Sequence, residues 1–375
     1  MSAFLYSRAI FNGQAGASEM GGLGSIFSRS KHRYRPRRGG MFAHSIAALI
    51  LAILFLPTAR GQGEADPDAH DWIERMRKAS SSLSHIGTYV YDDGAAMQSV
   101  RIVRRIDPRG FKERLFSLSG VAREVIRDGD QVVCIMSDTR SVLIAEHLSD
   151  VHDGSLPIPG SRFERSTIDD LGAYEISQHR TLERVAGREG VVIDIVPKDR
   201  YRYASRLVID RHTGLLLKSD LRSSDGTSLE RLFYTHLDIP ESIPDIALRP
   251  EIPDTGFTRH ELKPRRETVP SDPPPDFARW SAKWVPEGFE MISRSFDIAH
   301  PGRKPVDHRL FSDGHASFSL FIGDIQKDSA APPPRDILGA VNSFTRIEGS
   351  VQIIVLGEVP MHTVEKVALS VAPIH

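Results

Sequence analysis

The stretch Tyr201–Ile239 constrains the fold of this chain more than any other, because its residues divide cleanly into strands and turns. His212-Thr213-Gly214 and Ser224-Asp225-Gly226 are turn signals that cut it into three runs of strand length. Asp-Gly is a preferred hairpin connector because both of its positions tolerate positive φ. The spacing therefore predicts a three-stranded antiparallel meander inside a larger sheet.

The middle run of this meander alternates apolar and charged residues, which is the period-2 pattern of a sheet that is solvated on one side. Its charged face carries Lys218, Asp220 and Arg222, and its apolar face must be buried against other parts of the protein. We expect that cover to be the rest of a curved sheet plus one or two helices, an arrangement that can enclose a cavity. The candidate lining residues of this cavity are Leu215, Leu217, Leu221 and Phe233.

The N-terminal residues have the pattern of a secretory leader. Ile46–Leu56 is an unbroken apolar run of 11 residues, with a basic cluster before it and Ala59-Arg60-Gly61 after it. A membrane-spanning helix needs about 20 apolar residues, so the run predicts a signal peptide cleaved near Gly61 rather than an anchor. Met41 stands where an ordinary leader begins, so the sequence leaves open whether translation starts at Met1 or at Met41.

Charge and cysteine content narrow the function classes. Of the 48 Lys and Arg and the 49 Asp and Glu, 40 and 48 follow residue 61, so this part has a net charge of −8. Such an acidic chain is not a general nucleic-acid binder. Cys134 is the only cysteine and lies among apolar residues, which predicts a buried strand residue and no intramolecular disulfide.

The chain after the leader alternates strand-like runs with turns. Asp71–Ile86 has a helical apolar stripe, with Asp71 placed to cap the helix. Asp153–Thr181 interrupts the strands with a helix-like segment at Leu171–Ile176. The predicted strands before the meander are Gly87–Tyr91, Ala96–Ile106, Phe111–Ser117, Arg123–Arg127, Gln131–Met136, Ser141–Ala145, Thr181–Val185 and Val191–Pro197.

A proline-rich stretch, Pro240–Pro275, lacks an apolar pattern and predicts an extended linker. The expected organisation is a leader (1–61), a large domain (66–240), the linker (241–275) and a small domain (276–375). The predicted class is α+β: a large unclosed antiparallel β-barrel with covering helices, then a small α+β domain with an antiparallel sheet. The small domain's predicted elements are strands at Trp280–Phe289, Arg294–Phe296, Val306–Ser312, Ala316–Gly323, Asn342–Glu348 and Ser350–Gly357, and a closing helix at Pro360–Val371.

No sequence motif for catalysis is present. The chain has no G-x-S-x-G elbow, H-E-x-x-H pair, P-loop or C-x-x-C, and its 15 histidines are scattered. We therefore predict no catalytic, metal-binding or cofactor-binding residues and no cofactor. Turns explain the acidic pairs Asp92-Asp93 and Asp169-Asp170 better than a catalytic or calcium site does, because Asp is favoured in turns.

Basic residues gather in the strands after residue 100, within an acidic protein. Arginines on the solvated face of a sheet can bind phosphates or a segment rich in carboxylates. An ordinary solvated outer face explains the same pattern, and the sequence leaves both interpretations open. The candidate contacts to a partner are Arg101, Arg104, Arg114 and Arg123.

Several spaced segments resemble one family. Trp284–Phe289 (WVPEGF), Arg309–Ser319 (RLFSDGHASFS) and Gly357–Pro360 (GEVP) resemble, in this order, small-domain landmarks of the RseB/MucB family of periplasmic negative regulators of the sigma-E (AlgU-type) envelope-stress sigma factor. Arg123–Gly129 (REVIRDG) and Arg202–Glu230 resemble segments of that family's large domain. The likeness covers roughly residues 70–375.

The resemblance implies a large domain similar to lipoprotein carriers of the LolA/LolB type, joined to a small α+β domain. It also implies a function in the periplasm. Such a protein grips the periplasmic domain of an RseA/MucA-like anti-sigma factor, shields it from site-one proteolysis, and is released by lipopolysaccharide or another acyl-chain ligand. The alternatives are a periplasmic lipid or lipoprotein carrier and, with only scattered His and Asp behind it, a hydrolase. Homo-oligomers remain open.

Overall fold

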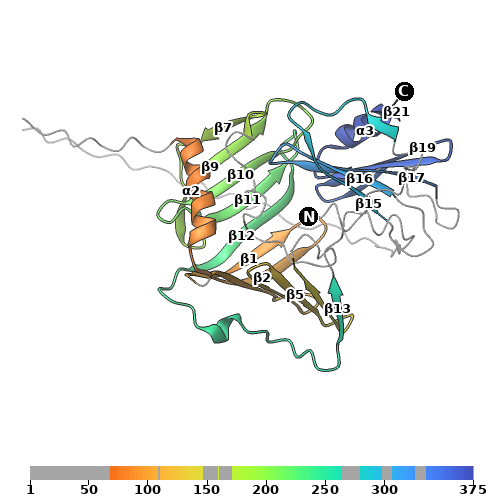
Figure 1. Cartoon of the computed structure of the whole chain (residues 1–375). Coiled ribbons are helices and arrows are strands. Elements are labelled where there is room, and N and C mark those ends of the chain that lie inside the picture. Colours follow the sequence, from red (N-terminus) through yellow and green to blue (C-terminus); the bar gives the residue numbers. More distant parts are fainter. Residues whose placement is uncertain are drawn as a thin grey trace, which may run out of the picture. The chain divides into compact units, whose positions relative to one another are not determined.

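The computed structural model describes residues 68–374, except Arg109, residues 147–170 other than Pro159, and residues 263–278, 298–305 and 326–334. The predicted leader lies outside this part of the chain, as do the Asp169-Asp170 pair and the second half of the predicted linker. Within the described residues, no helix is both long enough and apolar enough to cross a membrane. Two main sheets, each with a helix packed against it, form the described part (Figure 1).

The larger sheet contains thirteen strands among the described residues. Its order is β13-β6-β5-β4-β3-β2-β1-β12-β11-β10-β9-β7, with β8 paired to β9. The two end strands do not pair with each other, so the sheet is open, as predicted. The strands are β1 (His85–Asp92), β2 (Met97–Asp107), β3 (Gly110–Ser117), β4 (Arg123–Asp128), β5 (Gln131–Met136), β6 (Ser141–Ala145), β7 (Tyr174–Gln178), β8 (Glu183–Val185), β9 (Arg188–Pro197), β10 (Ala204–Asp210), β11 (Leu216–Arg222), β12 (Ser228–Asp238) and β13 (Thr258–Leu262).

Helix α2 (Ala69–Ser82) packs on β9, β10 and β11 through the stripe formed by Trp72, Ile73 and Met76. The predicted cap, Asp71, is not the capping residue. Asp68 caps the helix by accepting the backbone N–H groups of His70 and Asp71 at 2.8 and 2.9 Å, while the Asp71 carboxylate accepts the N–H of Asp68 at 3.1 Å. This reciprocal capping box satisfies donors that the first turn leaves unpaired.

The face of the large sheet that α2 covers, called here the α2 face, is apolar well beyond the helix. Tyr89 lies opposite Val100, and Ile102 lies opposite Leu115, which in turn lies opposite Val125. All five side chains are at most 2% exposed, so one continuous core runs from β1 to β4. Such cross-strand pairs are the unit of sheet stabilisation.

The opposite, outer face of β2, β3 and β4 is crossed by the chain that follows β12. This segment, residues 240–257, is called here the strap, and it contains the 3-10 helix η3 (Asp245–Leu248). Ile243 and Leu248 pack against Val103, and Ile252 and Phe257 pack beside Ile126, Ile135 and Val142. The proline content predicts a linker over Pro240–Pro275, but residues 240–257 pack on the large sheet through these four spaced apolar side chains.

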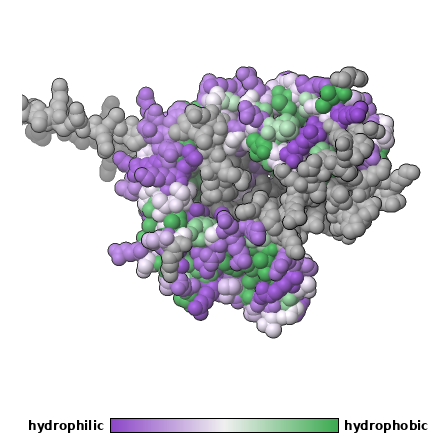
Figure 2. All heavy atoms as spheres, viewed as in Figure 1, coloured by the Kyte–Doolittle hydropathy of each residue, from purple (hydrophilic) through white to green (hydrophobic). Residues whose placement is uncertain are grey.

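Buried charges also hold the strap. Arg114 donates hydrogen bonds to the carbonyl of Ala247 and the carboxylate of Glu251, at 3.3 and 2.9 Å, and forms an ion pair with Glu124. Glu124 accepts the backbone N–H groups of Glu251 and Ile252, both at 3.0 Å. The strap continues into β13, which pairs in parallel with β6 and covers that edge. Figure 2 shows hydrophilic and hydrophobic residues interspersed over the visible described surface.

The smaller sheet has the order β15-β16-β17-β20-β19-β18, and α3 (Met361–Ser370) covers one of its faces. Val364 and Val367 of α3 pack against Phe318, Leu320 and Val355. The predicted small α+β domain with an antiparallel sheet is confirmed. Its strands are β14 (Trp280–Ala282), β15 (Glu290–Asp297), β16 (Val306–Ser312), β17 (Ser317–Asp324), β18 (Arg335–Leu338), β19 (Val341–Glu348), β20 (Val351–Gly357) and β21 (Val371–Pro373), where β14 and β21 form a separate pair.

Two local predictions are wrong. The helix expected at Leu171–Ile176 is in part strand β7, because Tyr174 and Ile176 alternate and Ile176 lies opposite Ile195 of β9. The single strand expected at Trp280–Phe289 is β14 followed by a turn at Gly288, whose φ of 82° is accessible to glycine at little cost.

The strap yields a matched pair of arginine substitutions. Arg114→Met leaves the Glu124 carboxylate, which is 0% exposed, without its cation. We expect a loss of about 3–5 kcal/mol in the free energy of unfolding, because a buried charge without its partner is strongly destabilising. Arg123→Met breaks the more exposed ion pair with Asp138, so it should cost about 1 kcal/mol or less. Urea unfolding of both variants measures the difference, and equal losses would contradict the buried role of Arg114.

Candidate functional site

The four candidate arginines do not form one surface. Strand alternation places Arg101 and Arg114 on the outer face of the large sheet, and Arg104 and Arg123 on the α2 face. Arg104 and Arg114 are buried in ion pairs, Arg123 contacts Asp138 at 3.2 Å, and Arg101 is exposed. Arg101 and Arg114 share a face and both lower the pKa of Glu251, Arg114 through its hydrogen bond and charge and Arg101 through its charge, but Arg114 is buried, so the four arginines do not form one exposed basic patch.

The four candidate cavity residues do not all lie together: Leu215, Leu217 and the half-buried Phe233 belong to one apolar cluster, and Leu221 belongs to another. Leu215 packs beneath α2, whereas Leu221 packs in a different cluster with Tyr203 and Ala340. Phe233 lies between the register partners Lys218 and Val90, so alternation places it on the outer face of the sheet.

A β-bulge displaces Leu217 from the predicted face. Val208 pairs with Lys218, but the next residue, Ile209, pairs with Leu216, so Leu217 is the extra residue. Leu216 then takes the place under α2. Leu217 is instead fully buried near Gly190, where an added Cβ would lie 2.3 Å from Cγ1 of Val208 and 3.4 Å from Leu217. A bulge reverses the alternation of side chains, which period-2 reasoning cannot anticipate.

The space between α2 and the sheet is small and polar at one end. A cavity of about 10 Å³, close to the minimum for one water molecule, lies there. The Arg104 and Arg127 guanidiniums donate to Glu113 at 3.0 and 3.1 Å, and both stack over Phe111. An acyl chain therefore has no room at this cavity. Its lining residues are Ser80, His85, Ile102, Arg104, Pro159, Leu215, Leu216 and Tyr234.

His85 lies in this cavity wall with its Nε2 atom 3.2 Å from the Tyr234 hydroxyl. Burial, and after it the neighbouring Arg104 guanidinium, lower the pKa of His85 to about 4. The imidazole is therefore neutral in the folded protein near neutral pH, and charging it requires opening this part of the core.

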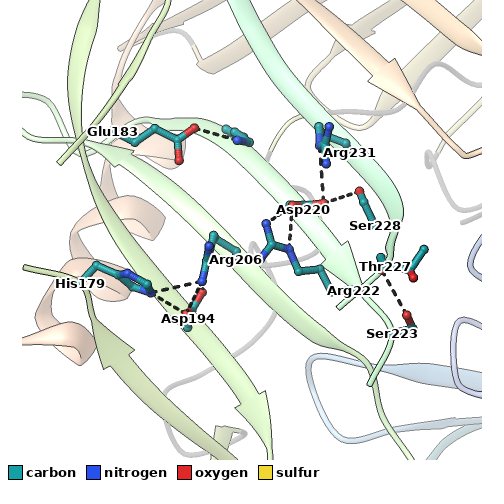
Figure 3. Close-up of polar contacts among 11 residues, drawn as sticks. His179, Glu183, Asp194, Arg206, Asp220, Arg222, Ser223, Thr227, Ser228 and Arg231 are labelled. Atoms are coloured by element: carbon teal, nitrogen blue, oxygen red, sulfur yellow. Dashed lines mark hydrogen bonds and ion pairs between the residues drawn. The ribbon is translucent and has the colours of Figure 1, made fainter. Parts of the chain in front are cut away.

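The outer face of β8–β12 carries a ladder of charged side chains (Figure 3). Arg206 donates to Asp194 at 2.6 and 2.8 Å, and His179 lies 2.6 Å from the same carboxylate. Burial alone would raise the pKa of Asp220, but hydrogen bonds from Ser228 and Arg222 outweigh it and keep that pKa below its usual value. Both carboxylates are thus already paired with basic side chains of neighbouring residues.

The strongest concentration of buried polar contacts lies where the large and small domains meet. The Arg202 side chain, from the β9–β10 loop, is 0% exposed. It donates Nε–H to Asp313 at 2.5 Å and also binds the carboxylate of Asp199 and the carbonyl of Glu287. Its guanidinium lies 4.7 Å from the ring centroid of Phe289. One arginine thus joins two segments of the small domain to the large one.

Asp313 is satisfied on both sides of its carboxylate. Oδ2 accepts the Tyr174 hydroxyl at 2.9 Å as well as Arg202, and Oδ1 accepts the N–H groups of His315 and Ala316 at 2.9 and 2.6 Å. The Ser205 hydroxyl lies 3.1 Å from Nε2 of His315. Charge-assisted bonds of this kind are the stronger hydrogen bonds in proteins.

A second set of contacts flanks the Arg202 anchor. Asn342 donates to the Tyr203 hydroxyl at 2.7 Å, and Thr363 donates to the carbonyl of Tyr201 at 3.0 Å. Lys366 of α3 donates to the Tyr201 hydroxyl at 2.9 Å and lies 3.7 Å from the Trp284 ring centroid. The loop before β10 therefore carries most of the contacts between the domains.

Comparison with known proteins decides the family. The model of the MucB/RseB N-terminal domain matches residues 68–252, and the model of the MucB/RseB C-terminal domain matches residues 275–372. The chain belongs to the MucB/RseB family. The Sigma factor AlgU regulatory protein MucB of Pseudomonas aeruginosa is 30% identical over 334 residues, which cover 88% of this chain and 97% of that protein. The Sigma-E factor regulatory protein RseB of Escherichia coli is 27% identical and covers 81% of this chain and 90% of its own length.

Solved MucB structures share the fold of both domains. The structure of the MucA/MucB complex of Pseudomonas aeruginosa matches with a TM-score of 0.63 and 28% identity, over 82% of this chain and 99% of that one. A second structure, of MucB with MucA(peri), gives 0.62 at the same identity, over 82% and 100% of the two chains. The curated relatives are named regulatory proteins, not enzymes.

No sequence motif marks the residues that meet at the junction of the two domains. Arg202 and Asp313 lie within segments that carry the family resemblance, yet they are 111 positions apart, and no pattern indicates that they meet. The one available signal was local: Asp313 precedes Gly314 in a turn, where an aspartate usually binds backbone N–H groups. In this chain it does so with one oxygen and uses the other for the junction.

His85 predicts a pH dependence of stability. Its pKa is about 4 in the folded protein against 6.5 for an unperturbed histidine, so the unfolded chain binds one more proton between these values. Stability should fall as the pH drops from 6.5 to 4, by about 3 kcal/mol. His85→Gln should remove this part of the slope, whereas His236→Gln, at an exposed site, should keep it. Urea unfolding between pH 7.5 and 4.5 tests this, and parallel slopes in all three proteins would contradict it.

Arg202 predicts coupling between the domains. Arg202→Met removes the cation from buried Asp313, so the junction should lose about 3–5 kcal/mol. We expect the single calorimetric transition of the parent chain to split in two, as each domain then unfolds by itself. Arg206→Met, which breaks a partly exposed pair within the large domain, serves as the control and should preserve one transition. A single transition in both variants would show that other contacts carry the coupling.

Proposed function

We propose that this chain restrains an envelope-stress sigma factor by binding the periplasmic segment of a membrane anti-sigma factor. The observation that carries the proposal is the match of both domains to MucB in its complex with MucA. The relatives that span nearly the whole chain are named as regulators of sigma factors, which points to the same role.

The place of action follows from the leader. An apolar run of 11 residues after a basic cluster is typical of export, so we infer that the protein works in the periplasm after cleavage near Gly61. The partner must then expose its binding segment on the same side of the inner membrane. This requirement fits the periplasmic domain of a single-pass anti-sigma factor.

Shielding of the partner from site-one proteolysis follows from binding an extended segment. A protease needs its substrate as a free extended chain, and a segment buried in an interface cannot enter its active site. The buried junction around Arg202 keeps the two domains in a defined arrangement, so both can contact one segment without the entropy cost of ordering them at that moment.

Release by lipopolysaccharide or another acyl-chain ligand needs a change in the large domain. The cavity beneath α2 has about 10 Å³, so a chain must displace part of the α2 packing to enter. Each buried CH₂ contributes about 0.8 kcal/mol, so several methylenes can offset that cost. A ligand that favours the opened form then lowers the affinity for the partner. By linkage, the bound partner lowers the affinity for the ligand by the same factor.

The test measures partner affinity with and without lipid. The mature chain should bind the recombinant periplasmic domain of its cognate anti-sigma factor in calorimetry, and a lipid A-like amphiphile should raise the Kd by about 5–150-fold. The same headgroup without acyl chains is the control and should leave the Kd unchanged.

The alternatives give different results in this experiment. Unchanged affinity at saturating amphiphile would remove lipid release but keep the regulator. No binding of the anti-sigma domain, together with cross-linking to lipoproteins, would support a lipid or lipoprotein carrier instead.

A further inference from the structure

Tyr174, the first residue of β7, belongs to two parts of the molecule at once. Its side chain is 4% exposed and lies in the apolar cluster that α2 forms with the large sheet, together with Leu171 and Trp72. Helix α2 and β7 are in contact, and Figure 1 shows them next to each other. The Tyr174 hydroxyl donates at 2.9 Å to Oδ2 of Asp313, which belongs to the small domain. One side chain therefore joins the packing beneath α2 to the domain junction.

A turn of the small domain lies against the end of the α2 face. Ser205 lies opposite Ile195, which lies opposite Ile176, so these three residues share the α2 face. Tyr174 precedes Ile176 by two positions on the same strand and shares this face too. The Ser205 hydroxyl lies 3.1 Å from Nε2 of His315, and the rings of Tyr174 and His315 meet edge-on with centroids 5.2 Å apart. The small domain thus contacts the same face of the sheet that α2 covers.

The position of the Tyr174 ring depends on the packing of α2. Protein interiors are close-packed, so a buried ring is held by the side chains around it, and opening the space beneath α2 removes part of this support. The Tyr174 hydroxyl can then leave Asp313, whose carboxylate is 2% exposed and also binds Arg202. A buried carboxylate that loses a donor is less well satisfied. The junction is therefore weaker when α2 is displaced than when it is packed.

We infer that the Tyr174 hydroxyl couples the packing of α2 to the domain junction, so that an acyl-chain ligand entering beneath α2 loosens the arrangement that binds the partner. This inference deepens the proposed function and rests on it for the identity of the ligand and the partner. Coupling requires a contact that differs between two states of the protein. The bond from Tyr174 to Asp313 is such a contact, because it is made when α2 is packed and lost when α2 is displaced. Tyr174 is a positioning residue, since it acts through Asp313.

Hydrogen exchange of the mature chain tests this coupling without ligand or partner. Ile73→Ala leaves a cavity beneath α2, because Ile73 is 2% exposed in that packing. The backbone amides of His315 and Ala316 donate to Asp313 and so report on the junction. We expect Ile73→Ala to speed their exchange by about tenfold in the parent chain. Tyr174→Phe removes the hydroxyl and keeps the ring, so in its background the same change should be less than about twofold.

Tyr203→Phe is the matched control. The Tyr203 hydroxyl also joins the domains, by accepting from Asn342, but its ring packs in a different cluster from the one under α2. Both Phe variants should weaken the junction and raise the basal exchange of the two amides, whereas only Tyr174→Phe should remove the response to Ile73→Ala. Equal responses to Ile73→Ala in all three backgrounds would overturn the inference. If Ile73→Ala fails to fold, Ile73→Val, a smaller loss of packing, takes its place.

The second measurement uses the partner. It compares the Kd for the anti-sigma periplasmic domain with and without a lipid A-like amphiphile. The ratio of the two Kd values should fall toward one in Tyr174→Phe, by about fivefold or more, and keep its parental value in Tyr203→Phe. A parental ratio in Tyr174→Phe would overturn the inference and leave the proposed function intact. A parent chain that binds no anti-sigma domain would overturn the proposed function, and the exchange result would still decide whether Tyr174 links α2 to the junction.

Discussion

The buried ion pair between Arg202 and Asp313 is the interaction on which the two-domain arrangement depends. Removing two charges from water costs more than their attraction returns unless further hydrogen bonds satisfy them. Arg202 finds these in Asp199 and the carbonyl of Glu287, and Asp313 finds them in Tyr174 and the N–H groups of its own turn. If either side chain left the junction, the other would remain as a buried charge without its partner. The contact therefore specifies one orientation more than it adds stability.

The large sheet is open, so it has two faces and two edges that other parts of the chain must cover. Helix α2 covers one face over β9–β11, and the strap covers the other over β2–β4. The strap then becomes β13 and protects the edge at β6. The strap also stabilises the buried ion pair between Arg114 and Glu124 on the outer face. Two backbone N–H groups of the strap donate hydrogen bonds to the Glu124 carboxylate.

The α2 face is closely packed among the residues that the structure describes. Here the core from Tyr89 to Val125 is closed, and the cavity near Arg104 has the size of one water molecule. A ligand that enters the space beneath α2 must first disrupt this packing. Binding can then be coupled to the junction, because the β9–β10 loop that carries Arg202 joins two strands beneath α2.

The sequence by itself determined the local elements, because turn chemistry and period-2 alternation act over a few residues. The meander from Tyr201 to Ile239, the strands Gln131–Met136 and Val306–Ser312, and the order of the two domains could all be predicted. The family could also be identified, since its landmarks are short contiguous segments. Only tertiary structure decided which side chains share a site. The bulge at Leu217 reverses a face, the strap recruits Arg114, and Arg202 meets Asp313 across 111 positions. Each of these depends on a partner distant in sequence, and no local pattern encodes such a meeting.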